Sequence, residues 1–195
     1  MKKTILWILI ACLSVGLMVG AYFLYQSLSE RFLPDSLGDA AATTPPAEDG
    51  GDGGEGNGYL APDFTVLTMD GQEASLSDYF GRPIVINFWA TWCHYCVTEM
   101  PAFEEAYRAH PEVQFLMINV TDGMQETEAT ARAYLAEKGY TFPVFFDKKL
   151  DAYMTYAPPG LPFTLFLNAE GQLVTYASGA INYALLEKGI GMITD

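Results

Sequence analysis

A nearly continuous apolar run ends just before two closely spaced cysteines, and this junction constrains the fold more than any other feature of the chain. The run at residues 83–89 (PIVINFW) is rich in β-forming side chains and predicts a strand that is covered on both faces. After Cys93, apolar residues recur three or four positions apart, as they do on one face of a helix: Val97, Met100, Phe103 and Tyr107. The sequence therefore predicts a buried strand that passes directly into a helix, with a C-x-x-C pair at the helix start.

Strands and helices alternate along the rest of this region. Apolar runs and alternating patterns predict strands at residues 64–67, 83–89, 113–120, 142–146, 163–167 and 173–177. Helical spacing predicts one helix from Cys93 onward and others at residues 126–138, 151–156 and 184–192. A turn at residues 168–171 joins the last two strands as a hairpin. This order predicts an α/β fold with one mixed sheet and helices on both of its faces.

The C-x-x-C pair has a chemical rationale at the start of a helix. Cys93 faces free backbone N–H groups and the positive end of the helix dipole, and both stabilise a thiolate. Cys96 follows one helical turn later, close enough to form a disulfide with Cys93. The pair predicts thiol–disulfide exchange, with Cys93 attacking and Cys96 resolving the mixed disulfide. This redox-active disulfide needs no cofactor.

Two other uses of the cysteine pair are alternatives. A zinc site would need four ligands, but the domain has no second ligand pair, and His94 cannot readily join the same tetrahedron as its neighbours. A purely structural disulfide is the other alternative, although closing so short a loop contributes little entropy. We therefore expect no metal site.

Residues 5–25 (ILWILIACLSVGLMVGAYFLY) carry no charge, and a helix of this length spans roughly the 30 Å hydrocarbon core of a membrane. Lys2 and Lys3 precede the segment, which favours an N-terminus inside the cell and an extracytoplasmic domain. We expect residues 1–34 to be an uncleaved, single-pass anchor in the cell membrane. A cleaved signal peptide and a lipoprotein box at Cys12 are alternatives, but the apolar run continues far beyond Cys12.

The composition changes sharply after this segment. Residues 35–58 are rich in Gly, Pro, Ala and acidic side chains, which predicts a disordered acidic linker and leaves residues 59–195 as the folded domain. The whole chain has 24 acidic against 10 basic residues, so its net charge is −14. Such a chain repels the phosphates of nucleic acid, and a protein or small-molecule partner is expected instead.

The residues around the cysteines resemble a known family. NFWATWCHYC (87–96), followed by Glu99-Met100-Pro101, is similar to the TlpA/ResA group of thioredoxin-fold disulfide reductases. APDF (61–64), LSDYFG (76–81) and GLPFT (160–164) match the same family in the same order. The resemblance implies a thioredoxin-like fold for residues 59–195 and a membrane-tethered or secreted protein that reduces extracytoplasmic cysteines, often those of apocytochrome c. It also implies a membrane electron donor of the DsbD/CcdA kind.

The same resemblance implies roles for individual residues. Glu99 would exchange the proton of Cys96, whereas the alternative is an acid that only complements the helix dipole. Pro162 would be a cis proline packed against the cysteines. The backbone of Leu161 would then pair with an extended substrate strand.

Three neighbours of the cysteines are expected at the substrate-binding surface: Trp92, His94 and Tyr95. The family usually has Pro where this chain has Tyr95, and the change alters both the helix entry and the surface beside Cys93. An imidazole at His94 favours the Cys93 thiolate and an oxidising, DsbA-like role, whereas the alternative is an exposed polar residue without redox effect. The direction of the reaction therefore stays open at this point.

Other classes of protein fit less well. A peroxiredoxin shares the APDF segment but needs Pro-x-x-x-Thr-x-x-Cys, which does not occur before Cys93. A copper chaperone of the Sco kind needs Cys-x-x-x-Cys and a distant histidine, and no histidine follows His110. A non-catalytic thioredoxin-fold binding module is a further alternative, although such a module has no need for both cysteines.

Overall fold

The computed structural model describes residue 19, residues 37–39 and residues 59–194. The described strands are β1 (Gly38–Asp39), β2 (Thr65–Thr68), β3 (Glu73–Ser75), β4 (Ile84–Trp89), β5 (Gln114–Asn119), β6 (Val144–Phe146), β7 (Phe163–Leu167) and β8 (Leu173–Ser178). The described helices are the 3-10 helix η3 (Leu76–Tyr79) and the α-helices α2 (His94–Ala109), α3 (Glu128–Lys138), α4 (Asp151–Tyr156) and α5 (Tyr183–Thr194).

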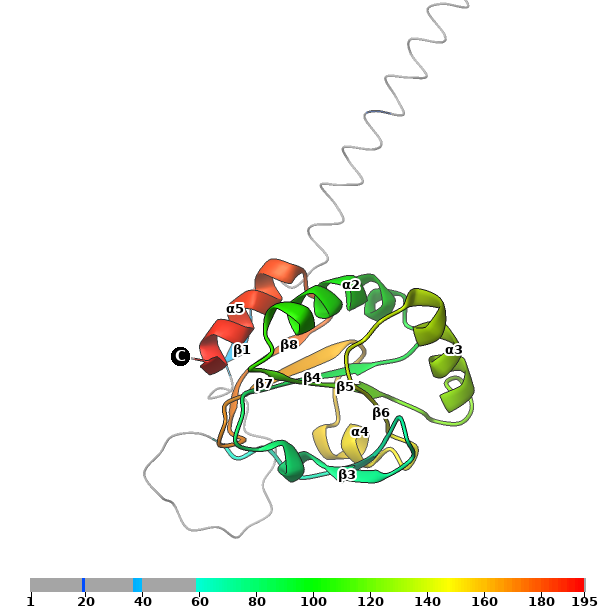
Figure 1. Ribbon diagram of the computed structural model, residues 1–195, viewed down its shortest axis with the longest axis horizontal. Helices are drawn as coiled ribbons and strands as arrows, with labels where there is room; N and C mark the ends of the chain where they lie inside the picture. The colour runs from blue at the N-terminus through cyan, green and yellow to red at the C-terminus, as the bar shows by residue number, and fades with distance from the viewer. Residues whose placement is uncertain (1–18, 20–36, 40–58, 195) are drawn as a thin grey trace, which may run out of the picture. The chain divides into compact units, whose positions relative to one another are not determined.

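The strands form one mixed sheet in the order β1-β8-β7-β4-β5-β6-β2-β3. Strands β4, β5 and β6 are parallel, and the remaining pairs are antiparallel. Helices α2, α3 and α5 lie on one face of the sheet and α4 lies on the other (Figure 1). The prediction of a mixed sheet with helices on both faces is confirmed.

Strand β4 lies near the middle of the sheet, and all six of its residues are buried. Val85 and Trp89 belong to the apolar cluster beneath α2, α3 and α5, whereas Ile84, Ile86 and Phe88 belong to the cluster on the α4 side. Successive side chains of a strand point to opposite faces of the sheet. A strand that is buried on both faces therefore needs a continuous apolar run rather than an alternating one. The chain leaves β4 at the edge of the sheet where α2 begins.

Helix α2 is tied to α5 at the end remote from the cysteines. His110 ends α2, and its ring nitrogens contact two carboxylates: Nδ1 lies 2.9 Å from Glu112 Oε1 and Nε2 lies 2.8 Å from Glu187 Oε1 of α5. Partial burial opposes protonation of His110, but the hydrogen bonds to the two carboxylates outweigh it and raise the pKa of the imidazole. This contact helps to fix α5 against α2.

The predicted disorder of residues 35–58 does not hold for Gly38 and Asp39. These residues form β1, which pairs antiparallel with Thr175 and Tyr176 of β8. A side chain on Gly38 would collide with the ring of Tyr176, so the missing Cβ permits this close approach. Thr175 Oγ1 also donates a hydrogen bond of 2.6 Å to the Gly38 carbonyl. Residues 40–58 lie outside the described residues.

The predicted membrane segment at residues 5–25 lies outside the described residues, apart from Val19. In the part of the chain that the structure describes, no helix combines the length and the apolar character needed to cross a membrane.

Candidate active site at the Cys93–Cys96 disulfide

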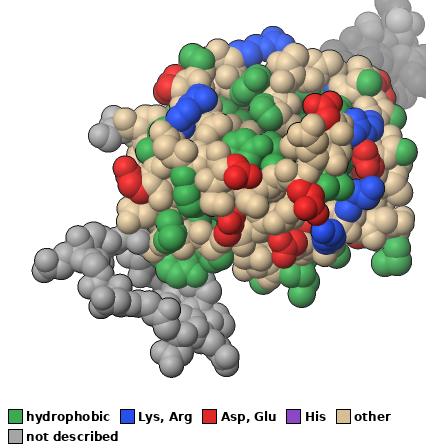
Figure 2. All heavy atoms as spheres, turned by 60° about the horizontal axis from the view of Figure 1, so that its bottom comes forward, with side chains coloured by type: hydrophobic (Ala, Val, Ile, Leu, Met, Phe, Trp, Pro, Cys, Tyr) green, Lys and Arg blue, Asp and Glu red, His purple; other side chains and the backbone are tan. Residues whose placement is uncertain are grey.

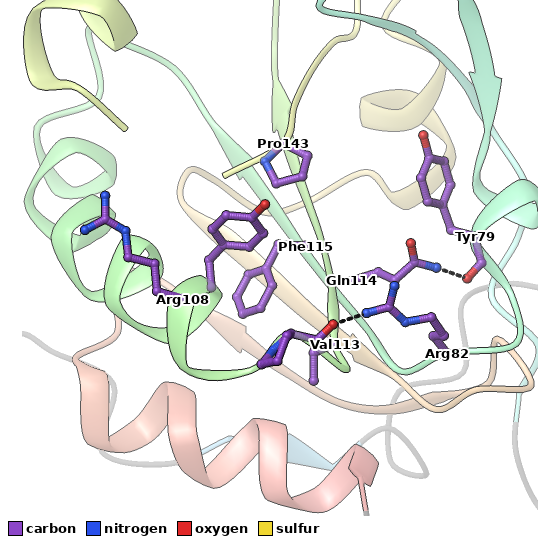
Figure 3. Close-up of a pocket in the computed structure, with 9 residues that line it drawn as sticks. Tyr79, Arg82, Arg108, Val113, Gln114, Phe115 and Pro143 are labelled. Carbon is purple, nitrogen blue, oxygen red and sulfur yellow. Dashed lines mark hydrogen bonds between the residues drawn. The ribbon is translucent and has the colours of Figure 1, made fainter. Parts of the chain in front are cut away.

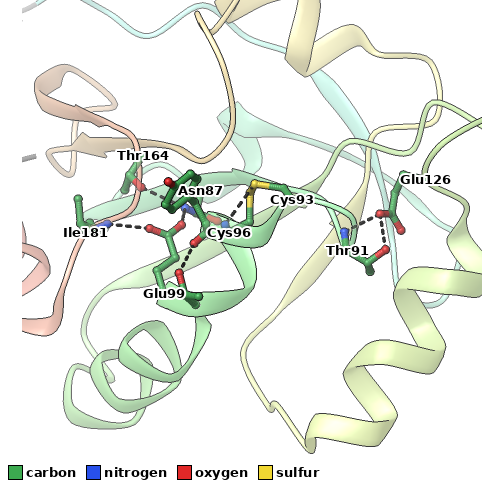
Figure 4. Close-up of a disulfide and its surroundings, with 10 residues drawn as sticks. Asn87, Thr91, Cys93, Cys96, Glu99, Glu126, Thr164 and Ile181 are labelled. Carbon is green, nitrogen blue, oxygen red and sulfur yellow. Dashed lines mark hydrogen bonds between the residues drawn. A yellow bond between two sulfur atoms is a disulfide. The ribbon is translucent and has the colours of Figure 1, made fainter. Parts of the chain in front are cut away.

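The two cysteines form a disulfide at the start of α2, as the C-x-x-C spacing predicts, with their Cα atoms 5.2 Å apart (Figure 4). Cys93 is the N-cap of the helix, and its Sγ accepts a hydrogen bond of 3.2 Å from the Cys96 backbone N–H. In the reduced protein the same N–H and the helix dipole stabilise negative charge on Cys93. Cys93 is 6% exposed and Cys96 is fully buried, so only Cys93 is accessible to an incoming sulfur.

Glu99 lies one turn further along α2 and is buried with 3% of its surface exposed. Its Oε1 accepts 2.8 Å from Asn87 Nδ2 of β4, and its Oε2 accepts 2.9 Å from the Ile181 backbone N–H just before α5 (Figure 4). Asn87 Nδ2 also donates to Thr164 Oγ1 of β7. The carboxyl group is thus held directly by β4 and by the segment before α5, and β7 contacts it only through Asn87.

Burial raises the pKa of Glu99 to about 8, and the hydrogen bonds from Ile181 and Asn87 only partly oppose this shift. A carboxyl group with such a pKa can gain or lose a proton near neutral pH, which an ordinary surface glutamate cannot do. Its burial distinguishes Glu99 from the exposed acids that commonly complement a helix dipole.

Glu126 is a second buried carboxylate near the disulfide, and the sequence analysis did not identify it. It is fully buried just before α3. Its Oε2 accepts hydrogen bonds from the Thr91 backbone N–H at 2.5 Å and from Thr91 Oγ1 at 2.7 Å, and its Oε1 accepts from Thr130 Oγ1 at 2.9 Å. Thr91 is two residues before Cys93, so Glu126 fixes the segment that leads to the cysteines (Figure 4).

The predicted substrate-contacting side chains beside the cysteines are exposed. Trp92 is 53% exposed and Tyr95 is 55% exposed, although both carry large apolar surfaces. The rings of His94 and Tyr95 meet edge to face with centroids 5.7 Å apart. These exposed aromatic side chains flank Cys93 in the sequence and are available to contact a partner.

The Leu161–Pro162 segment precedes β7, and its peptide bond is cis, as the family resemblance implies. Phe163 pairs with Phe88 of β4, so Pro162 lies beside the end of β4 that leads to the cysteines. Leu161 packs against the apolar cluster that includes Cys93 and Cys96. The structure therefore brings this segment to the same edge of the sheet as the disulfide.

A cavity of about 420 Å³ lies at the opposite end of the parallel strands. Its lining includes Tyr79, Arg82, Tyr107, Arg108 and Gln114 (Figure 3). The Arg82 guanidinium donates to the carbonyls of Pro111 and Glu112, and Arg108 pairs with Glu104. Its arginines are thus engaged by the protein itself, and its lining holds no cysteine, histidine or carboxylate, which leaves the disulfide as the candidate centre of chemistry.

Among the residues that the structure describes, no cluster of three or more His, Cys, Asp or Glu side chains could hold a metal ion. The reactive group is the cysteine pair itself.

Comparison with known proteins agrees with this geometry. The model of the AhpC/TSA family matches residues 58–176. The thiol-disulfide oxidoreductase ResA of Geobacillus kaustophilus is 31% identical over 138 residues, which are 70% of this chain and 77% of that protein. The thioredoxin-like protein YneN of Bacillus subtilis is 31% identical over 69% of this chain and 79% of its own length.

Solved structures show the same fold. A protein assigned as the thiol:disulfide interchange protein DsbE in Chlorobium tepidum superposes with a TM-score of 0.61 at 26% identity, covering 68% of this chain and 94% of that one. StoA from Bacillus subtilis superposes with a TM-score of 0.59 at 24% identity, covering 67% and 98%.

Proposed function

Because the chain belongs to the AhpC/TSA family and is a thiol–disulfide oxidoreductase of the ResA and DsbE type, we propose that it reduces disulfide bonds in proteins outside the cytoplasm. The observation that carries this proposal is the disulfide at the start of α2, with one sulfur accessible and a titratable carboxyl group buried one turn away. A purely structural disulfide would need neither feature.

The reaction begins from the reduced protein. The Cys93 thiolate attacks one sulfur of the substrate disulfide, and the other substrate sulfur leaves as a thiolate and takes up a proton. Cys96 then loses its proton and attacks Cys93 Sγ, which releases the second substrate sulfur as a thiolate that is also protonated. The substrate has gained two electrons and two protons, and the Cys93–Cys96 disulfide has formed.

Glu99 accepts the proton of Cys96 during the resolving step and returns it when the protein is reduced again. Its position one turn after Cys96 and its pKa of about 8 support this role, because the carboxyl group changes protonation in the pH range in which a thiol reacts. The contacts from Asn87 and Ile181 hold the carboxyl group in place.

The substrate is a polypeptide that lies across the surface around Cys93. The exposed rings of Trp92, His94 and Tyr95 contact its side chains, and the Leu161–Pro162 segment offers backbone groups to an extended strand. The resemblance to ResA favours apocytochrome c, in which two cysteines must be reduced before haem is attached. This substrate assignment rests on the family alone.

A reductase of this kind must itself be reduced after each turnover. We propose a membrane electron donor of the DsbD/CcdA kind, which would pass electrons to Cys93–Cys96 by the same exchange chemistry.

Nucleic acid is not a partner in this proposal, and the surface charge supports that choice. Basic side chains alternate with acidic ones over the face shown in Figure 2 and do not gather into a basic patch.

The proposed location is the cell membrane, with residues 5–25 as a single-pass anchor, the N-terminus inside and the domain outside. The uncharged 21-residue segment and the two preceding lysines support it. Protease added to intact spheroplasts should then digest the domain and leave cytoplasmic proteins whole. A domain that survives until the membrane is lysed would show that this topology is wrong.

A DsbA-like oxidant is the second candidate function, and a specific observation favours it. The Cys96 N–H already donates to Cys93 Sγ, and the same interaction stabilises the thiolate of the reduced form. A stable reduced form makes a protein oxidise its partners. The redox potential separates the two candidates.

Replacing each cysteine of the full-length chain tests the exchange mechanism. Cys93→Ser should abolish the reduction of insulin disulfides, because Cys96, the other cysteine of the pair, is fully buried. Cys96→Ser should accumulate mixed disulfides with substrate proteins, because the step that resolves them is lost. Non-reducing electrophoresis detects these adducts. Adducts on the Cys93→Ser variant instead would reverse the two roles, and full activity of both variants would refute the proposed function.

A further inference from the structure

The loop between β5 and α3 is held in one conformation by its own side chains. Asp122 Oδ1 accepts hydrogen bonds from the backbone N–H groups of Met124, Gln125 and Glu126, at 2.8, 2.9 and 2.9 Å. The Gly123 N–H donates 2.9 Å to the carbonyl of Glu126. Gly123 has a φ of 76°, a conformation that glycine adopts without strain. The turn therefore fixes the direction in which Met124 leaves the backbone.

This loop is attached to the active-site segment. Glu126, the residue immediately before the Thr127 cap of α3, accepts both hydrogen bonds that Thr91 donates. Thr91 is followed by Trp92 and Cys93. Figure 4 shows Glu126 against Thr91, on the side of the disulfide away from Glu99. The parallel pairing of β4 with β5, which brings Trp89 opposite Asn119, places both segments at the same edge of the sheet.

Met124 is 86% exposed, more than any other large apolar side chain in the described part of the chain. Its loop is ordered by four hydrogen bonds, so the exposure does not come from a frayed turn. The loop is joined to the segment that carries Trp92, which is 53% exposed. A large apolar side chain that an ordered loop holds exposed, on a loop bonded to the active-site segment, is a candidate contact for a partner.

We propose that the loop at residues 121–127 is one wall of the polypeptide docking surface, and that Met124 receives apolar side chains next to the substrate cysteines. This inference rests on the proposed function, because the occupant is the disulfide-containing polypeptide that Cys93 attacks. Cys93 is only 6% exposed, so a polypeptide must lie close against the surrounding surface to bring its disulfide to this sulfur. That surface extends from Tyr95 and Trp92 to Met124.

The chemistry of methionine fits an occupant of variable sequence. An unbranched thioether side chain adapts to different apolar partners and contacts aromatic rings favourably. Met124 thus selects for apolar residues beside the substrate cysteines without requiring one sequence. A small disulfide that carries no such side chain gains nothing from Met124, and this difference makes the proposal testable.

The test measures the rate at which the pre-reduced full-length chain reduces each of three disulfides. Two are synthetic peptides of equal length with one intramolecular disulfide, flanked by leucines in one peptide and by serines in the other. The third is the small aromatic disulfide of Ellman's reagent. Met124→Gln keeps the length of the side chain and removes its apolar end. It should lower the second-order rate constant for the leucine peptide about fivefold, and change the other two by less than about twofold, because only apolar burial is lost.

Two further variants complete the experiment. Met124→Leu should restore the rate with the leucine peptide, because it restores the apolar surface. Met192→Gln is the matched control, since Met192 is 45% exposed in the last turn of α5, far along the chain from the cysteines. It should leave all three rates unchanged.

The outcomes separate the two levels of the proposal. If Met124→Gln slows all three disulfides equally, or none of them, the docking role is refuted while the exchange function stands. If Met192→Gln has the same selective effect as Met124→Gln, the effect does not depend on the position of the methionine, and the docking role is refuted as well. If the unmodified chain reduces no disulfide at all, both the proposed function and this inference fall.

Discussion

At the scale of single residues, Glu99 combines two properties that oppose each other. Its side chain is ionised in water, yet the fold buries it beneath α2 with two neutral donors and no cation in hydrogen-bond contact. Burial therefore raises its pKa from 4.5 to about 8. The folded state binds this proton more tightly than the unfolded chain, so the group links stability to pH.

The sign of this linkage follows from the two pKa values. Below pH 4.5 both states hold the proton, and the stability associated with Glu99 is fully present. Between pH 4.5 and about 8 only the folded state holds it, so stability falls with rising pH, by at most about 1.4 kcal/mol per unit. We predict that Glu99→Gln removes this dependence, because glutamine stays neutral.

Denaturant unfolding of the oxidised protein at pH 5, 6, 7 and 8 measures the effect. The free energy of unfolding of the unmodified chain should decrease across this range relative to the Glu99→Gln variant. The difference between the two curves isolates Glu99 from the other titrating groups. Parallel curves would mean that Glu99 has an ordinary pKa and cannot act as the proton acceptor proposed here.

The residues of the site differ in how far sequence predicts them. Cys93, Cys96 and Glu99 follow one another on a single helix, so local spacing is enough to place them together. Local spacing does not place Glu126 at the site, because it lies 30 residues after Cys96. It reaches Thr91 only because β4 and β5 pair in parallel. An acid that follows a buried strand is the available signal, but many surface acids share it.

At the scale of elements, the long buried strands and amphipathic helices were predictable because each carries its own pattern. The run at 83–89 became β4, and the spacing after Cys93 became α2. Two short strands were missed. β3 has three residues and β1 has two, too few to show a period, and β1 exists only through its pairing with β8. Their formation depends on tertiary partners that a local pattern does not contain.

Element boundaries shifted for identifiable reasons. The predicted helix at 126–138 begins at Glu128 in the structure, because Thr127 caps it and Glu126 turns back to Thr91. The capping contact from Thr127 Oγ1 to the Thr130 N–H satisfies a backbone donor that the helix itself leaves free. Glu126, which was predicted to lie in this helix, instead supports the active-site segment through Thr91.

At the scale of the whole molecule, the direction of electron flow depends on how well the protein tolerates a new negative charge. Reduction turns a neutral disulfide into a dithiol in which Cys93 forms a thiolate. The helix dipole and the Cys96 N–H favour that charge. Burial of Cys93 within an apolar cluster opposes it, and the net charge of −14 adds a weaker, screened opposition.

We predict that the opposing contributions prevail and that the protein is a reductant. The thiolate would have one backbone donor in the observed geometry, whereas the groups that disfavour it act from the whole surrounding core. Equilibrating the full-length chain with glutathione at pH 7 gives its potential, which should lie near or below about −220 mV. A value near about −120 mV would place it with the oxidant DsbA instead. In that case the exchange chemistry at Cys93 would stand, but the electrons would flow from substrate to protein.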